Sequence, residues 1–161
     1  HSHSRYILCT IHRRENISSK DNLFSIFSSL DLINKHIKIV MPLHPHTKKK
    51  LDEFQIDSEI NLINPSDYHT MLSLLLNCEM VITDSGGLQK ESYFAHKKCI
   101  IVRNETEWTE LIANGSTVKS DPDNLFEDFN ILYDKNFKFS EPFFGNGKAS
   151  KLIVNQIKSF F

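Results

Sequence analysis

The chain has 161 residues, of which 40% are hydrophobic and 24% are charged, and its 19 lysine and arginine residues nearly balance 20 aspartate and glutamate residues. This length supports one domain with a buried core, and a formal net charge of −1 argues against general nucleic-acid binding, which needs a basic surface. No apolar run approaches the roughly 18 residues of a membrane span.

The first four residues alternate histidine and serine, which is typical of an expression-tag remnant, so the fold prediction covers residues 5–161. The apolar, β-prone run at residues 6–11 predicts a buried strand near the very start of this region. We therefore expect a domain taken from a longer protein, with a preceding domain absent from this chain.

Strand and helix patterns alternate along the rest of the chain. Asp21 is a predicted helix cap, Pro42 and Pro45 end the second strand, and Asp121 followed by proline is a typical helix start. The predicted strands cover residues 6–11, 37–43, 60–63, 80–83, 99–102 and 116–119. The predicted helices begin at Asp21, Thr47, Asp67, Ser85, Glu107, Asp121 and Asn146, and the last one runs to Phe161.

Strict alternation of apolar strands with helices indicates a parallel sheet that is covered on both faces. We predict an α/β domain with a six-stranded, doubly wound, Rossmann-like sheet. Ligands of such sheets bind beyond the carboxyl ends of the strands, and polar clusters follow five predicted strands here. They are residues 12–16, His44 with His46, Pro65 with Ser66, residues 84–87, and Arg103.

The strongest single signal is Ser85-Gly86-Gly87 at a predicted strand-to-helix turn. Adjacent glycines let a backbone approach a bulky ligand, and free amides at a helix start attract anions, so a phosphate or pyrophosphate fits this turn. Neither the P-loop pattern nor GxGxxG is present. Glu91, about two turns into the helix, can accept hydrogen bonds from ribose hydroxyls or can be an ordinary exposed acid; the sequence leaves both open.

Residues 12–15 place His12, Arg13 and Arg14 beside Glu15 just past a buried strand. Arginines can clamp phosphate oxygens and a histidine can protonate a leaving phosphate, which we favour over a solvated loop because of the Ser-Gly-Gly turn.

Metal and thiol chemistry have little support in the sequence. His44 and His46 lack a third ligand with suitable spacing, so we predict no metal site and no cofactor. Cys9, Cys78 and Cys99 lie in apolar stretches without CxxC spacing, which predicts reduced core cysteines in a cytoplasmic protein.

Five ordered motifs carry a family resemblance. They are residues 10–16 (TIHRREN), 42–45 (PLHP), 84–91 (DSGGLQKE), 103–107 (RNETE) and 145–150 (GNGKAS). Together they resemble the C-terminal half of a non-hydrolysing UDP-N-acetylglucosamine 2-epimerase. The resemblance implies one half of a GT-B architecture, in which two Rossmann-like domains enclose the active site, and implies a homodimer.

The resemblance also implies roles for single residues. It places the UDP diphosphate at Ser85, Gly86 and Gly87, the ribose at Glu91, and His12 where it assists the departure of the diphosphate. The further UDP-binding residues that it implies are Arg13, His44 and the segment from Pro65 to Met71 for uracil, and the cleft-facing residues are Arg103 and Glu107. Trp108 follows Glu107 where many relatives have Arg-Pro, a version associated with epimerases for capsule or O-antigen sugars.

The implied reaction interconverts UDP-GlcNAc and UDP-ManNAc, or a related UDP-2-acetamido sugar, by elimination and re-addition of UDP. In the family, carboxylates of the N-terminal domain handle the C2 proton, so this chain alone is expected to be inactive. Three alternatives stay open: the C-terminal nucleotide-sugar-binding domain of a GT-B glycosyltransferase, a stand-alone nucleotide sensor, and a hydrolysing epimerase.

Overall fold

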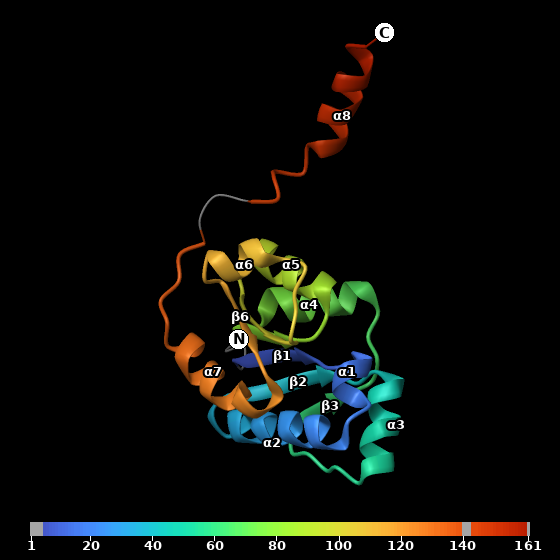
Figure 1. Cartoon of the computed structure of the whole chain (residues 1–161), viewed down its shortest axis with the longest axis vertical. Helices are drawn as coiled ribbons and strands as arrows, with labels where there is room; N and C mark the ends of the chain where they lie inside the picture. Colours follow the sequence, from blue (N-terminus) through green and yellow to red (C-terminus); the bar gives the residue numbers. More distant parts are fainter. Residues whose placement is uncertain (1–4, 140–142, 161) are drawn as a thin grey trace.

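Strands and helices alternate along the computed structural model, which describes residues 5–139 and 143–160 (Figure 1). The predicted tag remnant at residues 1–4 lies outside the described residues. The strands are β1 (Tyr6–Thr10), β2 (Lys38–Pro42), β3 (Asn61–Ile63), β4 (Met80–Thr83), β5 (Lys98–Val102) and β6 (Thr117–Ser120). The helices are α1 (Arg14–Ile17), α2 (Lys20–His36), α3 (Pro45–Phe54), α4 (Tyr68–Asn77), α5 (Gly86–Phe94), α6 (Thr109–Ala113), the 3-10 turn η1 (Pro122–Asn124), α7 (Leu125–Tyr133) and α8 (Ala149–Lys158).

The six strands form one parallel sheet in the order β3-β2-β1-β4-β5-β6. This is the strand order of a Rossmann fold, and the order reverses between β1 and β4, so a crevice is expected at the carboxyl ends of these two strands. The predicted doubly wound, Rossmann-like sheet is therefore confirmed. Thr10 at the end of β1 pairs with Thr83 at the end of β4, although the sequence separates them widely.

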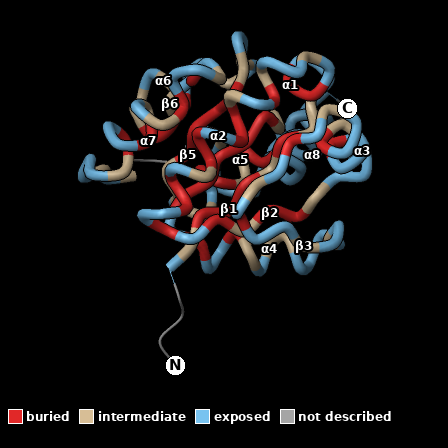
Figure 2. Tube along the Cα trace, turned by 90° about the horizontal axis from the view of Figure 1, so that it is seen from below, coloured by how far each residue is buried: buried red, intermediate tan, exposed pale blue. Residues whose placement is uncertain are grey.

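Each face of the sheet has its own apolar core. On one face Ile7 and Cys9 of β1 pack with α2 and α7, and on the other Leu8 packs with Leu75 of α4 and Leu88 of α5. Successive strand residues point to opposite faces. An uninterrupted apolar run in a strand therefore supplies side chains to both cores. Figure 2 shows the buried positions gathered in the central strands.

Two local predictions are corrected by the structure. Ser19, not Asp21, caps α2, because its Oγ accepts a hydrogen bond of 3.3 Å from the Asn22 amide. Part of the predicted polar loop after β1 is the short helix α1 (Arg14–Ile17). By contrast, the predicted caps at Asp67 and Ser85 are confirmed, since both side chains accept from a first-turn amide.

The last predicted helix is present as α8 and lies apart from the sheet and its flanking helices (Figure 1); Phe161 lies outside the described residues. None of its residues is buried. Large apolar side chains on α8, and one two residues beyond it, are 48–77% accessible: Leu152, Ile153, Val154 and Ile157 on the helix, and Phe160 after it. Among the described residues, none of the helices combines the length and apolar character that crossing a membrane requires.

Candidate functional site

A cavity of about 350 Å³ opens at the carboxyl ends of β1 and β4, where the strand order reverses. The residues that line it come from the ends of β1 to β4 and the first turns of the helices that follow. They are Thr10, Ile11, His12, Pro42, His44, Pro65, Ser66, Tyr68, Met71, Ser85, Gly87, Leu88 and Glu91. The structure thus brings together most of the predicted site residues, and the volume lies in the range of small-molecule sites.

The Ser-Gly-Gly turn forms the start of α5 at one wall of this cavity. Ser85 is the N-cap, and its Oγ lies 3.4 Å from the Leu88 amide that donates to it. The first amides of a helix have no partner within the helix, so they favour an anion. A Cβ added at Gly87 would have only Ser85 Oγ near it, at 3.9 Å, so the space beside the Gly87 backbone is open.

Asp84 joins the end of β4 to the segment after β1. Its side chain is fully buried and accepts hydrogen bonds from the His12 and Arg13 amides at 2.9 and 2.8 Å. The Asn16 side chain donates to it as well, at 3.1 Å, and also to the Val102 carbonyl at 2.9 Å. The sequence analysis placed Asp84 within a motif but missed this role; its only signal was a carboxylate directly after an apolar strand.

Two histidine rings lie next to each other in the lining of the cavity. The ring centroids of His12 and His44 are 5.6 Å apart, and His12 Nδ1 lies 3.4 Å from Asp84 Oδ1. His44 caps α3, and its Nδ1 accepts a hydrogen bond of 3.2 Å from the His46 amide. Partial desolvation of the His44 ring, with smaller effects from His12 and His46, lowers the pKa of His44.

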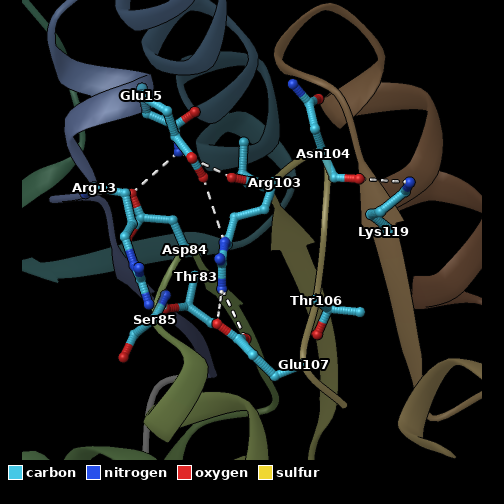
Figure 3. Close-up of polar contacts among 12 residues, drawn as sticks. Arg13, Glu15, Thr83, Asp84, Ser85, Arg103, Asn104, Thr106, Glu107 and Lys119 are labelled. Carbon is cyan, nitrogen blue, oxygen red and sulfur yellow. Dashed lines mark hydrogen bonds and ion pairs between the residues drawn. The ribbon is translucent and has the colours of Figure 1, made fainter. Parts of the chain in front are cut away.

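Four predicted site residues, Arg13, Gly86, Arg103 and Glu107, lie beside this cavity and not in its lining. Arg103 bridges Glu15 at 3.3 Å and Glu107 at 2.9 Å (Figure 3). A Cβ added at Gly86 would lie 3.2 Å from Glu107 Oε2 and 3.7 Å from Arg13 Nη2, so these two side chains flank the α5 start. A backbone hydrogen bond and the Arg103 contact lower the pKa of Glu107.

Trp108 fixes the loop after β5 onto α5. Its indole Nε1 donates a hydrogen bond of 2.8 Å to the Gly86 carbonyl, and the Lys90 ammonium lies 4.3 Å from the centre of its ring. The sequence analysis noted Trp108 only as a departure from the family pattern and did not predict this contact. No local pattern could have, since the partners are 22 residues apart.

The predicted uracil segment supplies a third wall of the cavity. Pro65 and Met71 line it as expected, and Tyr68, which is 63% accessible, adds an aromatic ring that the sequence analysis did not single out. Asp67 holds this segment in place by accepting a hydrogen bond of 2.8 Å from the Thr70 amide at the start of α4.

The cysteines and histidines show no arrangement for metal or thiol chemistry within the described part of the chain. No group of three or more His, Cys, Asp or Glu side chains there is placed to hold a metal ion. All three cysteines are free and buried, and burial raises the pKa of Cys78 to about 11 and of Cys99 to about 12.

The cavity at the switch point, with a phosphate-type helix start, agrees with a comparison to known proteins. A sequence model described as UDP-N-acetylglucosamine 2-epimerase matches residues 1–158. The chain belongs to the UDP-N-acetylglucosamine 2-epimerase family. The predicted family is therefore confirmed.

Individual epimerase-family relatives show similarity along nearly the whole chain. A Methanococcus maripaludis protein named UDP-N-acetylglucosamine 2-epimerase homolog is 34% identical, over 98% of this chain and 46% of its own length. A Pseudomonas aeruginosa UDP-2,3-diacetamido-2,3-dideoxy-D-glucuronate 2-epimerase is also 34% identical, over 97% of this chain and 45% of its own. The chain thus spans about half the length of the curated relatives that it matches.

A solved structure of the epimerase family shares the fold described above. The Methanocaldococcus jannaschii UDP-GlcNAc 2-epimerase in complex with UDP-GlcNAc and UDP superimposes with a TM-score of 0.85 and 32% identity. The similarity covers 97% of this chain and 46% of the solved chain. This proportion agrees with the prediction that the chain is one Rossmann-like half of a GT-B architecture.

Proposed function

We propose that this chain is the UDP-binding half of a two-domain UDP-N-acetylglucosamine 2-epimerase. The whole protein would interconvert UDP-GlcNAc and UDP-ManNAc, or a related UDP-2-acetamido sugar. The observation that carries the proposal is the position of the Ser85-Gly87 helix start and His12 on one cavity, at the point where the strand order reverses. Ligands of doubly wound sheets bind at this point.

The proposed UDP contacts follow the order of the cavity walls. The diphosphate lies at the α5 start, where the Gly86 and Gly87 amides and the Ser85 hydroxyl donate to its oxygens. Glu91 is five residues further along α5, a rise of about 7.5 Å, which suits a carboxylate that accepts from the ribose hydroxyls. Pro65, Tyr68 and Met71 give the uracil ring apolar surfaces, and both an aromatic ring and a thioether can pack on a base.

The proposed reaction needs two separate sets of groups. A base removes the C2 proton, and the electron pair forms a C1–C2 double bond as the C1–oxygen bond breaks and UDP leaves. A proton is then delivered to the other face of C2, and UDP adds back at C1, so that atoms and charge balance. This chain would stabilise the leaving diphosphate through the α5 amides, Arg13 and His12, with His44 donating from Nε2. The C2 acid and base would belong to the other half.

The sugar and the cellular role are part of the same proposal. The similarity to a protein named for a UDP-diacetamido-glucuronate supports a modified UDP-2-acetamido sugar, and the Glu107-Trp108 pair agrees with epimerases that serve capsule or O-antigen polysaccharides. We place the whole protein in the cytoplasm as a homodimer. The exposed apolar face of α8 would pack against the missing half.

Calorimetric titration of the chain with UDP tests the proposal. Saturable binding that weakens in Glu91→Gln, while Glu127→Gln at an exposed position of α7 leaves it unchanged, would support the assignment. A folded chain that binds no UDP at millimolar concentration would contradict it. The chain alone should convert no UDP-GlcNAc, and epimerised product in a proton NMR assay would show that the C2 acid and base are not confined to another half.

A further inference from the structure

The two oxygens of the Asp84 carboxylate have different neighbours. Oδ2 accepts from the His12 amide at 2.9 Å, the Arg13 amide at 2.8 Å and Asn16 Nδ2 at 3.1 Å. Oδ1 also accepts from the His12 amide, at 3.1 Å, and lies 3.4 Å from His12 Nδ1. Both oxygens therefore hold the backbone after β1, and Oδ1 is the one that also faces the imidazole ring.

The ring nitrogen that faces Asp84 is the one expected to carry hydrogen. An ionised carboxylate only accepts hydrogen bonds, and three N–H groups already donate to this buried one. A hydrogen on His12 Nδ1 is attracted to Oδ1, whereas a lone pair there is repelled. With hydrogen on Nδ1, the neutral ring leaves Nε2 as an acceptor.

We propose that Asp84 is a positioning residue that fixes His12 in the Nδ1–H tautomer and so presents Nε2 to the cavity. The identity of the group that meets Nε2, the UDP diphosphate, rests on the proposed function; the tautomer does not. When Nε2 takes a proton from solvent before UDP leaves, the Asp84 carboxylate balances the charge of the imidazolium. His12 can then give that proton to the leaving phosphate oxygen and take it back from the same oxygen when UDP re-adds.

His44 has the other neutral imidazole tautomer, with its hydrogen on Nε2. Its Nδ1 accepts from the His46 amide, so the hydrogen of neutral His44 is on Nε2. Two imidazoles with centroids 5.6 Å apart therefore offer one cavity an acceptor and a donor. Because Ser85 follows Asp84 directly, the same turn that starts the phosphate-type helix also sets the orientation of His12.

Long-range proton–nitrogen NMR spectra at about pH 8.5, well above the ordinary pKa of an imidazole, test the tautomer in the unmodified chain. The His12 signals are assigned by their loss in His12→Gln. We expect hydrogen on Nδ1 of His12 and on Nε2 of His44. Hydrogen on Nε2 of His12 would overturn the proposal without the need for any Asp84 variant.

Asp84→Asn tests the two carboxylate oxygens separately, because it keeps one oxygen and replaces the other with an NH₂ group. Its amide oxygen can replace Oδ2 and keep all three donors, although the second contact of the His12 amide, at Oδ1, is lost. Its NH₂ group then faces His12 Nδ1 and should move the ring hydrogen to Nε2. Asn16→Ala is the matched control, because it removes one donor and loosens the loop but keeps the carboxylate, and it should keep the Nδ1–H form. An unchanged tautomer in Asp84→Asn would contradict the proposal.

UDP titrations show whether Asp84 acts through His12. Asp84→Asn should weaken UDP binding about tenfold, and it should add little further loss in a His12→Gln background. Independent, additive losses would contradict the positioning role. If the chain binds no UDP at all, the proposed function fails, while the NMR spectra still decide the relationship between Asp84 and His12.

Discussion

The indole Nε1 of Trp108 donates a hydrogen bond of 2.8 Å to the carbonyl oxygen of Gly86. Gly86 is the first residue of α5, whose amides form the proposed diphosphate site, and Trp108 comes from the loop after β5. The bond therefore ties the α5 start to a loop that also carries Glu107, beside Gly86. Trp108 thus holds the turn that we propose as the diphosphate site.

Trp108→Phe should weaken UDP binding about fivefold, because it removes a hydrogen bond of about 1 kcal/mol but keeps a ring for the Lys90 ammonium. Calorimetry with UDP measures the affinity, and thermal unfolding should show only a small loss of stability. Trp108→Ala, which also removes the ring, should destabilise the fold more. Equal UDP affinity in the wild type and Trp108→Phe would show that the bond does not support the site.

Gly87→Ala should separate stability from binding. Alanine favours a helix over glycine by up to about 0.5–1 kcal/mol, and a Cβ at Gly87 meets only Ser85 Oγ, at 3.9 Å. The melting temperature should therefore stay level or rise. UDP affinity should fall about tenfold, since the added methyl group takes space at the proposed diphosphate. Unchanged affinity would place the diphosphate elsewhere.

Ser85→Ala and Ser85→Asp should affect the α5 cap and the ligand differently. Alanine removes the cap and should cost about 1 kcal/mol of unfolding free energy, whereas aspartate is a good cap and should keep it. The order of the two variants reverses for UDP affinity. The aspartate carboxylate repels the diphosphate, so Ser85→Asp should bind UDP at least about tenfold more weakly than the wild type. Urea unfolding and UDP titration of both variants measure the two effects. Tighter binding in Ser85→Asp than in Ser85→Ala would exclude an anion at this helix start.

The sequence predicted those parts of the site that depend on local pattern. Ser85 and Asp67 were predictable as caps because each is a small polar residue that precedes a helical period. The sheet was predictable because buried parallel strands are apolar at nearly every position. The carboxyl-end rule then placed His12, His44 and Ser85 at one end of the sheet, without any knowledge of distances, and all three line the cavity.

What the sequence could not predict depends on contacts between distant segments. The four residues of α1 are too few and too charged for a helical period. This helix carries Asn16, which bonds to Asp84, just after β4, and to Val102, at the end of β5. The roles of Asp84 and Trp108 likewise exist only after β1, β4 and β5 lie side by side. A tertiary contact of this kind leaves no periodic signal in the chain.

His44 should make the stability of the chain depend on pH. Its pKa is lowered in the fold, chiefly by desolvation, so below about pH 6.5 the unfolded chain binds more protons at this residue than the native chain. Its contribution to stability is therefore present at neutral pH. It is lost as the pH falls from about 6.5 through the lower pKa that His44 has in the fold. Protonation would also remove the α3 cap, since a protonated Nδ1 cannot accept from the His46 amide.

His44→Asn keeps a good cap residue that does not titrate, so it should lose less unfolding free energy than the wild type between pH 7.5 and pH 5.5. Urea unfolding at both values measures the difference. Asp67→Asn is the matched control at the α4 cap: hydrogen bonding from Thr70 lowers the pKa of Asp67 below its ordinary value of 3.8, so its titration lies outside this window. This control should lose as much stability on acidification as the wild type, and a His44→Asn variant that behaves in the same way would show that the cap does not carry the pH dependence.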